Sequence, residues 1–539
     1  MNKPWNRAAR GAVVMFLPAI AAGQTVSPTM SDATIVARGS FRFRGQVEWT
    51  HFDALFGVGG KTTQALGASL TANVDIAALP LLGPAQLATR TLAKAPSLQL
   101  SLGALRTAAD SRIATIPFSV EYGLTQRITL GINVPIVQAR TVLTAQLNGR
   151  SDSTANIGVN PAGFLLVSAA FNANAQVTSG LEAARQQLLQ RMATCTASPA
   201  SAGCPAFNAR AVEAAALAAE ASSFTDAAKT LYGVSAADPG APFVPIAGSP
   251  IQQAVDNHLS DLRFGFTSFG INGGSGSFAA AKERAANAQL QQLVSNGRYG
   301  IGLDSIGSTD QLSIGDIELS LASRLFNSFS DTLTGGLHWR GAVAGVVRLG
   351  TGRPARQNRP LDIGTGDGQT DVEVRGAIDM MLGNRLLTTV AGTYTQQLGS
   401  VKYDRLPYPP GLFFGLLDPE KGSIKPGNMA AVRVNPRFLV TRGLMIGGLI
   451  SASHRGADQV TMTDISTTGA DYGNPNSVNT WAGGLTLSYS NLATRGGTGD
   501  ARFPAEVHFS HLETVSANAG AAKSTRDAIE LRLYFRTRR

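Results

Sequence analysis

Histidines are the side chains best suited to proton transfer and metal binding, and this chain has six of them. His508 and His511 lie three residues apart in a segment that alternates as a strand does, and that spacing turns them to opposite faces. A hydrolase would need a serine or aspartate beside a histidine, and His338 and His454 could supply the histidine on spacing alone. No GxSxG or HExxH motif supports either of them. We therefore expect that the chain is not an enzyme and holds neither a metal nor a cofactor.

The segment from Asp362 to Asp371, DIGTGDGQTD, is superficially similar to an acidic calcium loop. It lacks the alternating ligand positions and the closing glutamate of an EF-hand. It also lacks the lysine and the following helix of a phosphate-binding loop. We interpret it as a tight glycine-rich loop.

The N-terminus has the pattern of a secretory leader, in which basic residues precede the apolar stretch Gly11 to Ala22. We expect a signal peptide at 1–23 and a mature chain that starts near Gln24; a short membrane anchor is the alternative. Loss of the leader lowers the formal net charge from +10 to +7. Without clusters of lysine or arginine, that excess does not indicate a nucleic-acid partner.

Cys195 and Cys204 are the only cysteines, and they lie in the loop-like stretch CTASPASAGC. No histidine lies beside them to complete a metal site. In an exported chain, two cysteines at this spacing predict a local disulfide.

Alternation of apolar and polar residues marks about twelve strands. In Asp371 to Leu382, DVEVRGAIDMML, the aliphatic residues share one side, and Glu373, Arg375 and Asp379 share the other. Most segments reach the roughly 9 to 11 residues that a tilted strand needs to cross a bilayer. The predicted strands are Phe41 to Phe56, Ile113 to Leu124, Arg127 to Ala139, Leu312 to Leu325, Thr332 to Leu349, Thr370 to Leu382, Arg385 to Gln397, Met429 to Val440, Leu444 to Gly456, Thr480 to Asn491, Ala505 to Val515 and Ala528 to Arg536.

Tight and long connections alternate along this series. Strands two and three meet at Thr125-Gln126 and strands six and seven at Gly383-Asn384, whereas the intervening links are long. Outer-membrane barrels have short periplasmic turns and long outer loops, and a soluble sandwich has no reason to separate its loops in this way. We therefore predict an all-β transmembrane antiparallel β-barrel over 24–539, with about 12 strands and a range of about 10 to 14. Both termini would lie in the periplasm of a Gram-negative cell.

The second long link, residues 143–310, is large enough to form a unit of its own. Ala206 to Leu231 and Phe278 to Val294 are rich in helix-forming residues, and a Pro/Gly-rich stretch separates them. We predict an α-helical insert in an extracellular loop. It could cap the barrel, plug the lumen or be mobile, and the sequence favours none of these.

The polar faces of the predicted strands would line the lumen, where rings of charge can select permeant solutes. The alternative is that arginines and carboxylates pair across the lumen and fill it. An apolar stretch in a predicted outer loop, Tyr408 to Leu417, could capture a hydrophobic solute, contact the outer leaflet or pack against the insert. The candidate solute-facing residues are Glu121, Asn133, Glu318, Arg324, Glu373, Arg375, Asp379, Arg433, Arg437 and Arg532.

Three blocks occur in a fixed order: VEYGLTQRITLGINVP from Val120, GDIELSLASRLF from Gly315, and RLGTGRPARQNRPLDIGTGDGQTDVEVRG from Arg348. With these blocks the sequence resembles the outer-membrane barrels of the MetA-pathway of phenol degradation family. That resemblance implies a channel for aromatic or other hydrophobic compounds, somewhat like the long-chain fatty-acid transporters. It implies no catalytic or ligand residue.

Taken together, we expect a porin-like outer-membrane channel that passes small hydrophobic or aromatic solutes through its lumen. Its partners would be outer-membrane lipid and lipopolysaccharide, the solutes, and the barrel-assembly machinery during biogenesis. One alternative is a surface barrel that acts in envelope structure or binds a partner through its helical insert. A third candidate is an outer-membrane hydrolase.

Overall fold

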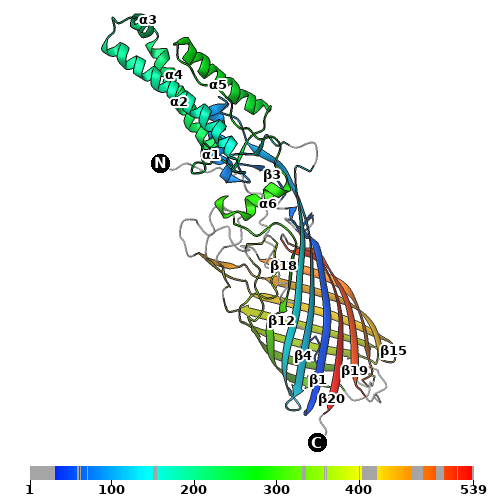
Figure 1. Cartoon of the computed structure of the whole chain (residues 1–539). Helices are drawn as coiled ribbons and strands as arrows, with labels where there is room; N and C mark the ends of the chain where they lie inside the picture. Colours follow the sequence, from blue (N-terminus) through cyan, green and yellow to red (C-terminus); the bar gives the residue numbers. More distant parts are fainter. Residues whose placement is uncertain are drawn as a thin grey trace. The chain divides into compact units, whose positions relative to one another are not determined.

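A closed antiparallel β-barrel of 12 strands forms the larger part of the computed structural model (Figure 1). The structure describes residues 31–57, 60, 62–68, 71–149, 154–299, 302–329, 335–356, 358–359, 361–399, 401–403, 422–462, 477–492, 503–518 and 520–536. The predicted leader at 1–23 and the apolar stretch from Tyr408 to Leu417 lie outside these residues.

Contacts divide the chain into two compact units. Unit 1, residues 1–69, 107–144 and 303–539, contains the barrel. Unit 2, residues 70–106 and 145–302, contains the described α-helices. Part of the first long link therefore belongs to the helical unit, whereas the sequence placed the insert only within 143–310.

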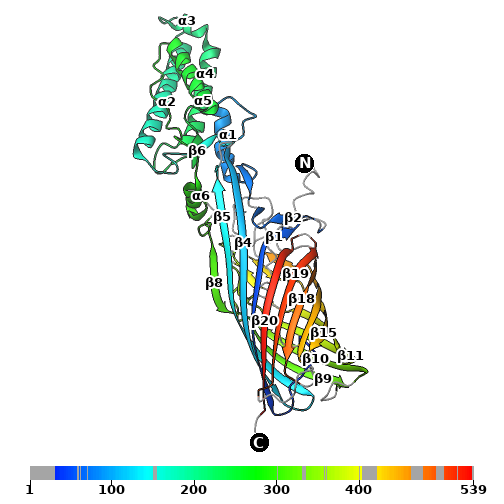
Figure 2. The ribbon, with the colours of Figure 1, turned by 90° about the vertical axis from the view of Figure 1, so that its right-hand side faces the viewer.

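The barrel closes because β1 pairs with β20 on one side and with β4 on the other (Figure 2). The twelve strands are β1 (Ser40–Phe56), β4 (Ser101–Gly123), β5 (Ile128–Leu147), β9 (Ile317–Asn327), β10 (Leu337–Leu349), β11 (Asp371–Leu382), β12 (Leu386–Gln397), β15 (Met429–Thr441), β16 (Leu444–Arg455), β18 (Val478–Ser490), β19 (Ala505–Ala517) and β20 (Ala522–Arg536). Short strands β2 (Thr63–Ala65) and β8 (Thr309–Ile314) pair with β1 and β5. A separate sheet holds β13 (Val401–Tyr403), β14 (Gly422–Lys425) and β17 (Gln459–Met462).

Each of the twelve predicted strands overlaps a strand of the barrel, but β4 and β20 begin earlier than predicted, and residues 332–334 of one prediction lie outside the described residues. One prediction is divided. The segment predicted at Leu312 to Leu325 is β8 followed by β9, separated at Gly315 and Asp316. The amide of Gly315 donates to the carbonyl of Pro135 at 2.8 Å, and the Asp316 carboxylate accepts from the amide of Gly352 at 2.8 Å. Asp316 thus turns towards the loop after β10 and interrupts the strand.

The two faces of each strand differ as the sequence predicted. Along β11, burial alternates at nearly every residue, with Val374 52% exposed and Arg375 1% exposed. In the hairpin of β4 and β5, Phe118, Leu130 and Ile132 are exposed on the outer surface. The outer face is therefore apolar, whereas polar and charged residues turn inward.

Unit 2 packs four longer helices around an apolar core: α1 (Gly83–Leu92), α2 (Ser168–Ala197), α4 (Ala211–Tyr232) and α5 (Pro250–Ser268). Ser249 caps α5, since its hydroxyl accepts from the amide of Gln252 at 3.2 Å. Among the described residues, no helix is both long and apolar enough to cross a membrane. The remaining elements are β3 (Ala72–Asp75), α3 (Cys204–Asn208), α6 (Asn287–Ser295), β6 (Ile157–Val159), β7 (Phe243–Pro245) and 3₁₀ turns at Pro80–Leu82 and Gly297–Tyr299.

The helix predictions for this unit were partly wrong. The segment from Ala206 to Leu231 mostly forms α4, but in the second predicted helix only α6 is helical. Before α6, the amide of Ala281 donates to the carbonyl of Pro245 at 3.1 Å. Ala281 therefore forms a β-bridge with Ile246 in place of a helical turn. The sequence also missed α2, because the buried Asn174 interrupts its apolar stripe and donates to the carbonyl of Tyr232 at 3.0 Å.

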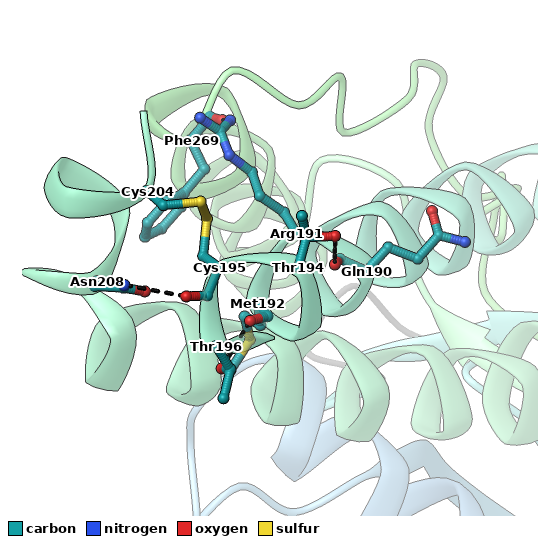
Figure 3. Close-up of a disulfide and its surroundings, with 9 residues drawn as sticks. All are labelled: Gln190, Arg191, Met192, Thr194, Cys195, Thr196, Cys204, Asn208 and Phe269. Atoms are coloured by element: carbon teal, nitrogen blue, oxygen red, sulfur yellow. Dashed lines mark hydrogen bonds between the residues drawn. A yellow bond between two sulfur atoms is a disulfide. The ribbon is translucent and has the colours of Figure 1, made fainter. Parts of the chain in front are cut away.

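Cys195 and Cys204 form a disulfide between the end of α2 and the start of α3 (Figure 3). Asn208 donates to the carbonyl of Cys195 at 3.2 Å. Arg191, one turn earlier on α2, donates to the carbonyl of Phe269 at 2.7 Å. The disulfide thus fixes the turn between two helices whose ends are also tied to α5.

Candidate functional site in the barrel lumen

A short segment ahead of β1, residues 31–39, enters the lumen. Asp32 and Ala33 are buried, and the amide of Val36 donates to the hydroxyl of Thr129 on β5 at 3.0 Å. Ala33 packs on small inward residues of β10 and β11, including Ala344 and Ala377. Larger side chains at these positions would occupy the space of the segment, so the alanines make room for it.

Gly123 is the point at which this segment meets the end of β4. A Cβ atom on Gly123 would lie 2.0 Å from the carbonyl oxygen of Ala37, which is closer than atoms can approach. The amide of Gly39 donates to the carbonyl of Gly123 at 2.8 Å. Only a glycine allows this close backbone approach, and Gly123 belongs to the block VEYGLTQRITLGINVP.

A first group of buried charges joins the closing strands of the barrel. Glu121 pairs with Arg42 and lies 3.4 Å from Arg44. Arg532 binds Asp32 at 2.5 Å and Glu530 at 2.8 Å, and it lies 3.6 Å from Glu506. The lumen segment is thereby tied to β20 through Asp32.

A second group lies on β9, β10 and β11. One oxygen of Glu318 accepts from Arg348 and from Arg375, each at 3.0 Å. Glu373 pairs with both of these arginines. All four side chains are at least nine-tenths buried, so the charges compensate one another within a buried site.

The other predicted lumen residues have separate positions. Asp379 pairs with Arg340 and accepts from Thr389, whose hydroxyl also accepts from Arg437 at 2.8 Å. Asn133 is buried and accepts from Ser119 at 2.8 Å. Arg324 donates to the carbonyl of Gln126 at 2.7 Å, in the tight turn, and belongs to neither charge group.

Arg433 faces a cavity of about 150 Å³ inside the barrel. The cavity lining combines charged, hydroxyl and apolar residues, among them Leu449 and Leu512. It brings four of the predicted residues together: Arg375, Arg433, Arg437 and Arg532. Towards the tight turns, the buried Met381, Leu387 and Met445 form an apolar cluster. Towards the long loops, a second buried apolar cluster contains Phe52, Ile113 and Val137.

The histidines do not form a catalytic group. His338 is the second residue of β10, whereas His454 is the last but one of β16, so they lie at opposite ends of the barrel wall. His508 lines the cavity, and His511 pairs with Asp527 at 2.8 Å on the next strand. Ser488 and Glu530 are the cross-strand neighbours of His508. Among the described residues, however, the Nε2 atom of His508 has no hydrogen-bond partner, so a nucleophile–base pair is not formed there.

The glycine-rich segment after β10 folds over Asp316. A Cβ atom on Gly366 would lie 2.6 Å from both carboxylate oxygens of Asp316. Asp362 binds Arg356 at 3.1 Å through its carboxylate. Burial, together with the nearby charge of Asp367, raises the pKa of Asp316 to about 6. In the described part of the chain no group of His, Cys, Asp or Glu could hold a metal ion.

Sequence reasoning missed several residues of the charge groups. Arg42 and Arg44, and also Glu48 on the cavity wall, alternate with apolar residues in the first predicted strand, so their inward direction could have been predicted. Arg348 at the end of β10 had the same signal. The sequence around Asp32 has no such alternation, because Asp32 precedes the first strand and is placed only by contacts with distant strands.

Comparisons with known proteins give distant matches in structure. No protein-family model matches the chain, and a search of curated proteins finds no match in sequence. An outer membrane channel from Pseudomonas putida F1 matches with a TM-score of 0.41 and 9% identity, over 95% of this chain and 100% of that one. The Ralstonia pickettii toluene transporter TbuX matches with a TM-score of 0.29 and 9% identity, over 97% and 99%. A Pseudomonas aeruginosa FadL homologue matches with a TM-score of 0.26 and 9% identity, over 92% and 90%.

Proposed function

We propose that this chain is an outer-membrane channel whose lumen admits small hydrophobic or aromatic solutes. The observation that carries the proposal is a cavity of about 150 Å³ within a closed barrel whose outer face is apolar. A protein cavity of about 150 Å³ is large enough to bind benzene. An apolar belt of this extent would be costly in water and is stable against lipid. Because Ser40 of β1 pairs with Arg536 of β20, the first barrel strand would begin and the last would end on the side of the tight turns, in the periplasm.

Selective passage fits the lumen better than general diffusion does. The segment at 31–39 and the two groups of buried charges occupy much of the interior, and apolar clusters lie at both ends of it. A hydrophobic solute would find apolar contacts at both ends and a small cavity between them. A large hydrated solute would have to displace buried ion pairs, at a cost of several kcal/mol (about 3–5 for one partner).

The test is to fill the cavity. Ala431 lines it, and the next residue, Val432, is 50% exposed on the outer face. We expect Ala431→Trp to lower the uptake of a radiolabelled monoaromatic hydrocarbon, severalfold, in cells with intact lipopolysaccharide that express the full chain. Val432→Trp adds the same indole to the same strand and should leave uptake unchanged. Equal uptake by the wild type, by Ala431→Trp and by cells without the protein would contradict the channel.

The second candidate function is partner binding through unit 2, and one observation favours it. Leu165, Leu166 and Val167 are consecutive and are 54%, 49% and 42% exposed. Leu166 has a positive φ of 55°, which is strained for a leucine. An exposed apolar run of this kind is typical of an interaction surface. The test is a Leu165→Ser, Leu166→Asn double variant. If this variant takes up solute as the wild type does but shows the envelope defect of cells that lack the protein, partner binding through unit 2 would be favoured.

A further inference from the structure

We propose that the lumen cavity binds the carboxylate group of a small organic anion, and that Arg433 is the residue that holds it. The inference deepens the proposed function, on which it rests, because it names the class of solute. That solute is a monocarboxylate with a small apolar body, such as an aromatic acid.

The cavity has more cations than anions. Five arginines line it, Arg375, Arg433, Arg437, Arg526 and Arg532, against three carboxylates, Asp32, Glu48 and Glu530. Most of the arginines have fixed partners. Arg526 lies 3.3 Å from Glu48, Arg532 binds Asp32 and Glu530, and Arg375 belongs to the charge group of Glu318 and Glu373.

Arg433 differs from the other four arginines. Within the residues that the structure describes, it forms neither an ion pair nor a hydrogen bond, whereas Arg437 donates to the hydroxyl of Thr389 at 2.8 Å. The seven residues that precede Ser31 in the predicted mature chain, QTVSPTM, contain no carboxylate either. The Nε atom of Arg433 is buried without an acceptor, and a charged donor that has lost water without gaining a partner is costly. An anion that enters the cavity would remove that cost.

The surroundings of Arg433 leave space for a ligand. Its cross-strand neighbours are Ala391 on β12 and Ser451 on β16, which are small and uncharged. Ala391, Ala431 and Leu449 also line the cavity and supply apolar surface near the guanidinium. A planar guanidinium binds a carboxylate through two parallel hydrogen bonds. The geometry therefore suits a carboxylate on Arg433 and a ring or short chain on the apolar wall.

Binding to the full-length protein in detergent micelles tests the inference directly. The probe is sodium benzoate, followed by calorimetry and by ligand-observed NMR at pH 7.5, and benzyl alcohol serves as its neutral counterpart. We expect benzoate to bind the wild type more tightly than benzyl alcohol. Arg433→Gln should weaken benzoate binding at least about tenfold, whereas Arg433→Lys should keep part of it. Arg385→Gln removes one exposed arginine from a tight turn and should have no effect.

A second variant covers the case in which Arg433→Gln does not fold. Ala391→Glu places a carboxylate beside Arg433, so the guanidinium would be paired internally and benzoate binding would be lost. The inference is overturned if the wild type does not bind benzoate, or if Arg433→Gln and Ala391→Glu bind it as the wild type does. Benzoate binding by a protein that takes up no aromatic compound would support this site and contradict the channel. Hydrocarbon uptake without benzoate binding would support the channel and contradict the carboxylate site.

Discussion

At the scale of single residues, the sequence blocks that begin at Val120 and Gly315 have specific structural roles. In the first block, Glu121 pairs with the arginines of β1. Gly123 leaves room for the lumen segment. Asp316 and Glu318, from the second, hold the glycine-rich loop and two arginines. The sequence could predict that Glu318 faces inward, because alternation fixes the face. It could not predict the partners, because they lie on other strands.

The shared carboxylate of Glu318 leads to a first prediction. Glu318→Gln would leave Arg348 and Arg375 with one carboxylate fewer in a buried site. Since breaking a buried pair costs about 3–5 kcal/mol, we expect the free energy of unfolding to fall by that order. Urea unfolding of the barrel in vesicles, followed by tryptophan fluorescence, measures it. Glu283→Gln is the control, because Glu283 is exposed in unit 2 and should change stability by less than about 0.5 kcal/mol.

At the scale of elements, regular strands were predictable and the irregular lumen segment was not. Period-two alternation of apolar and polar residues predicts a strand, and each of the twelve strands has this pattern. Residues 31–39 have no periodicity, and their position depends on Thr129, Arg532 and Gly123, which are far away in the chain. In unit 2, α2 was missed for a related reason, since a polar residue buried by tertiary contacts breaks its helical pattern.

The lumen segment gives the second prediction. Gly123→Ala would place a Cβ atom 2.0 Å from the carbonyl of Ala37, so the segment would have to move. We expect a severalfold rise in single-channel conductance in planar bilayers, because the displaced segment no longer fills the lumen. Gly376→Ala is the matched control, since a Cβ atom there meets no atom within 4 Å. A conductance equal to that of the wild type for both variants would mean that the segment does not limit ion flow.

The docking of α1 in unit 2 gives a prediction about pH. Glu220 binds Lys94 at 2.5 Å and His258 at 3.0 Å, and His258 also bonds the carbonyl of Leu92 at the end of α1. The hydrogen bond from Lys94, with a smaller one from His258, lowers the pKa of Glu220. A lowered carboxyl pKa stabilises the folded state above the unfolded pKa of about 4.3. That stability is lost as the pH falls through the lower, folded value.

Hydrogen exchange of the α1 amides measures this effect. We expect protection to fall as the pH is lowered below about 4.3, after correction for the intrinsic exchange rate. Glu220→Gln lacks the titrating group, so its protection should be lower at neutral pH and should change less with pH in the same range. Identical pH profiles for the two proteins would show that Glu220 does not hold α1 in place.

At the scale of the whole molecule, the barrel was predictable because many weak signals agreed. Twelve alternating segments and alternating loop lengths each favour a membrane barrel only slightly, but together they exclude a sandwich. The division into two units was harder to predict from the sequence. Residues 70–106 join the helical unit through contacts such as that between Leu92 and His258, and such a contact leaves no periodic pattern in the sequence.

The last prediction tests whether the barrel surface faces lipid. Val374 lies within β11 and is 52% exposed, and Val212, on α4 of unit 2, is 86% exposed. By exposure alone, arginine should be tolerated better at Val212 than at Val374, but by only a small margin. If lipid surrounds the barrel, Val374→Arg places a charge in hydrocarbon and should lower the unfolding free energy in vesicles by about 2–4 kcal/mol. Val212→Arg should stay within about 0.5 kcal/mol of the wild type, as surface substitutions in water do. Equal, small effects of the two substitutions would mean that water covers both valines, and the proposed membrane location would then be wrong.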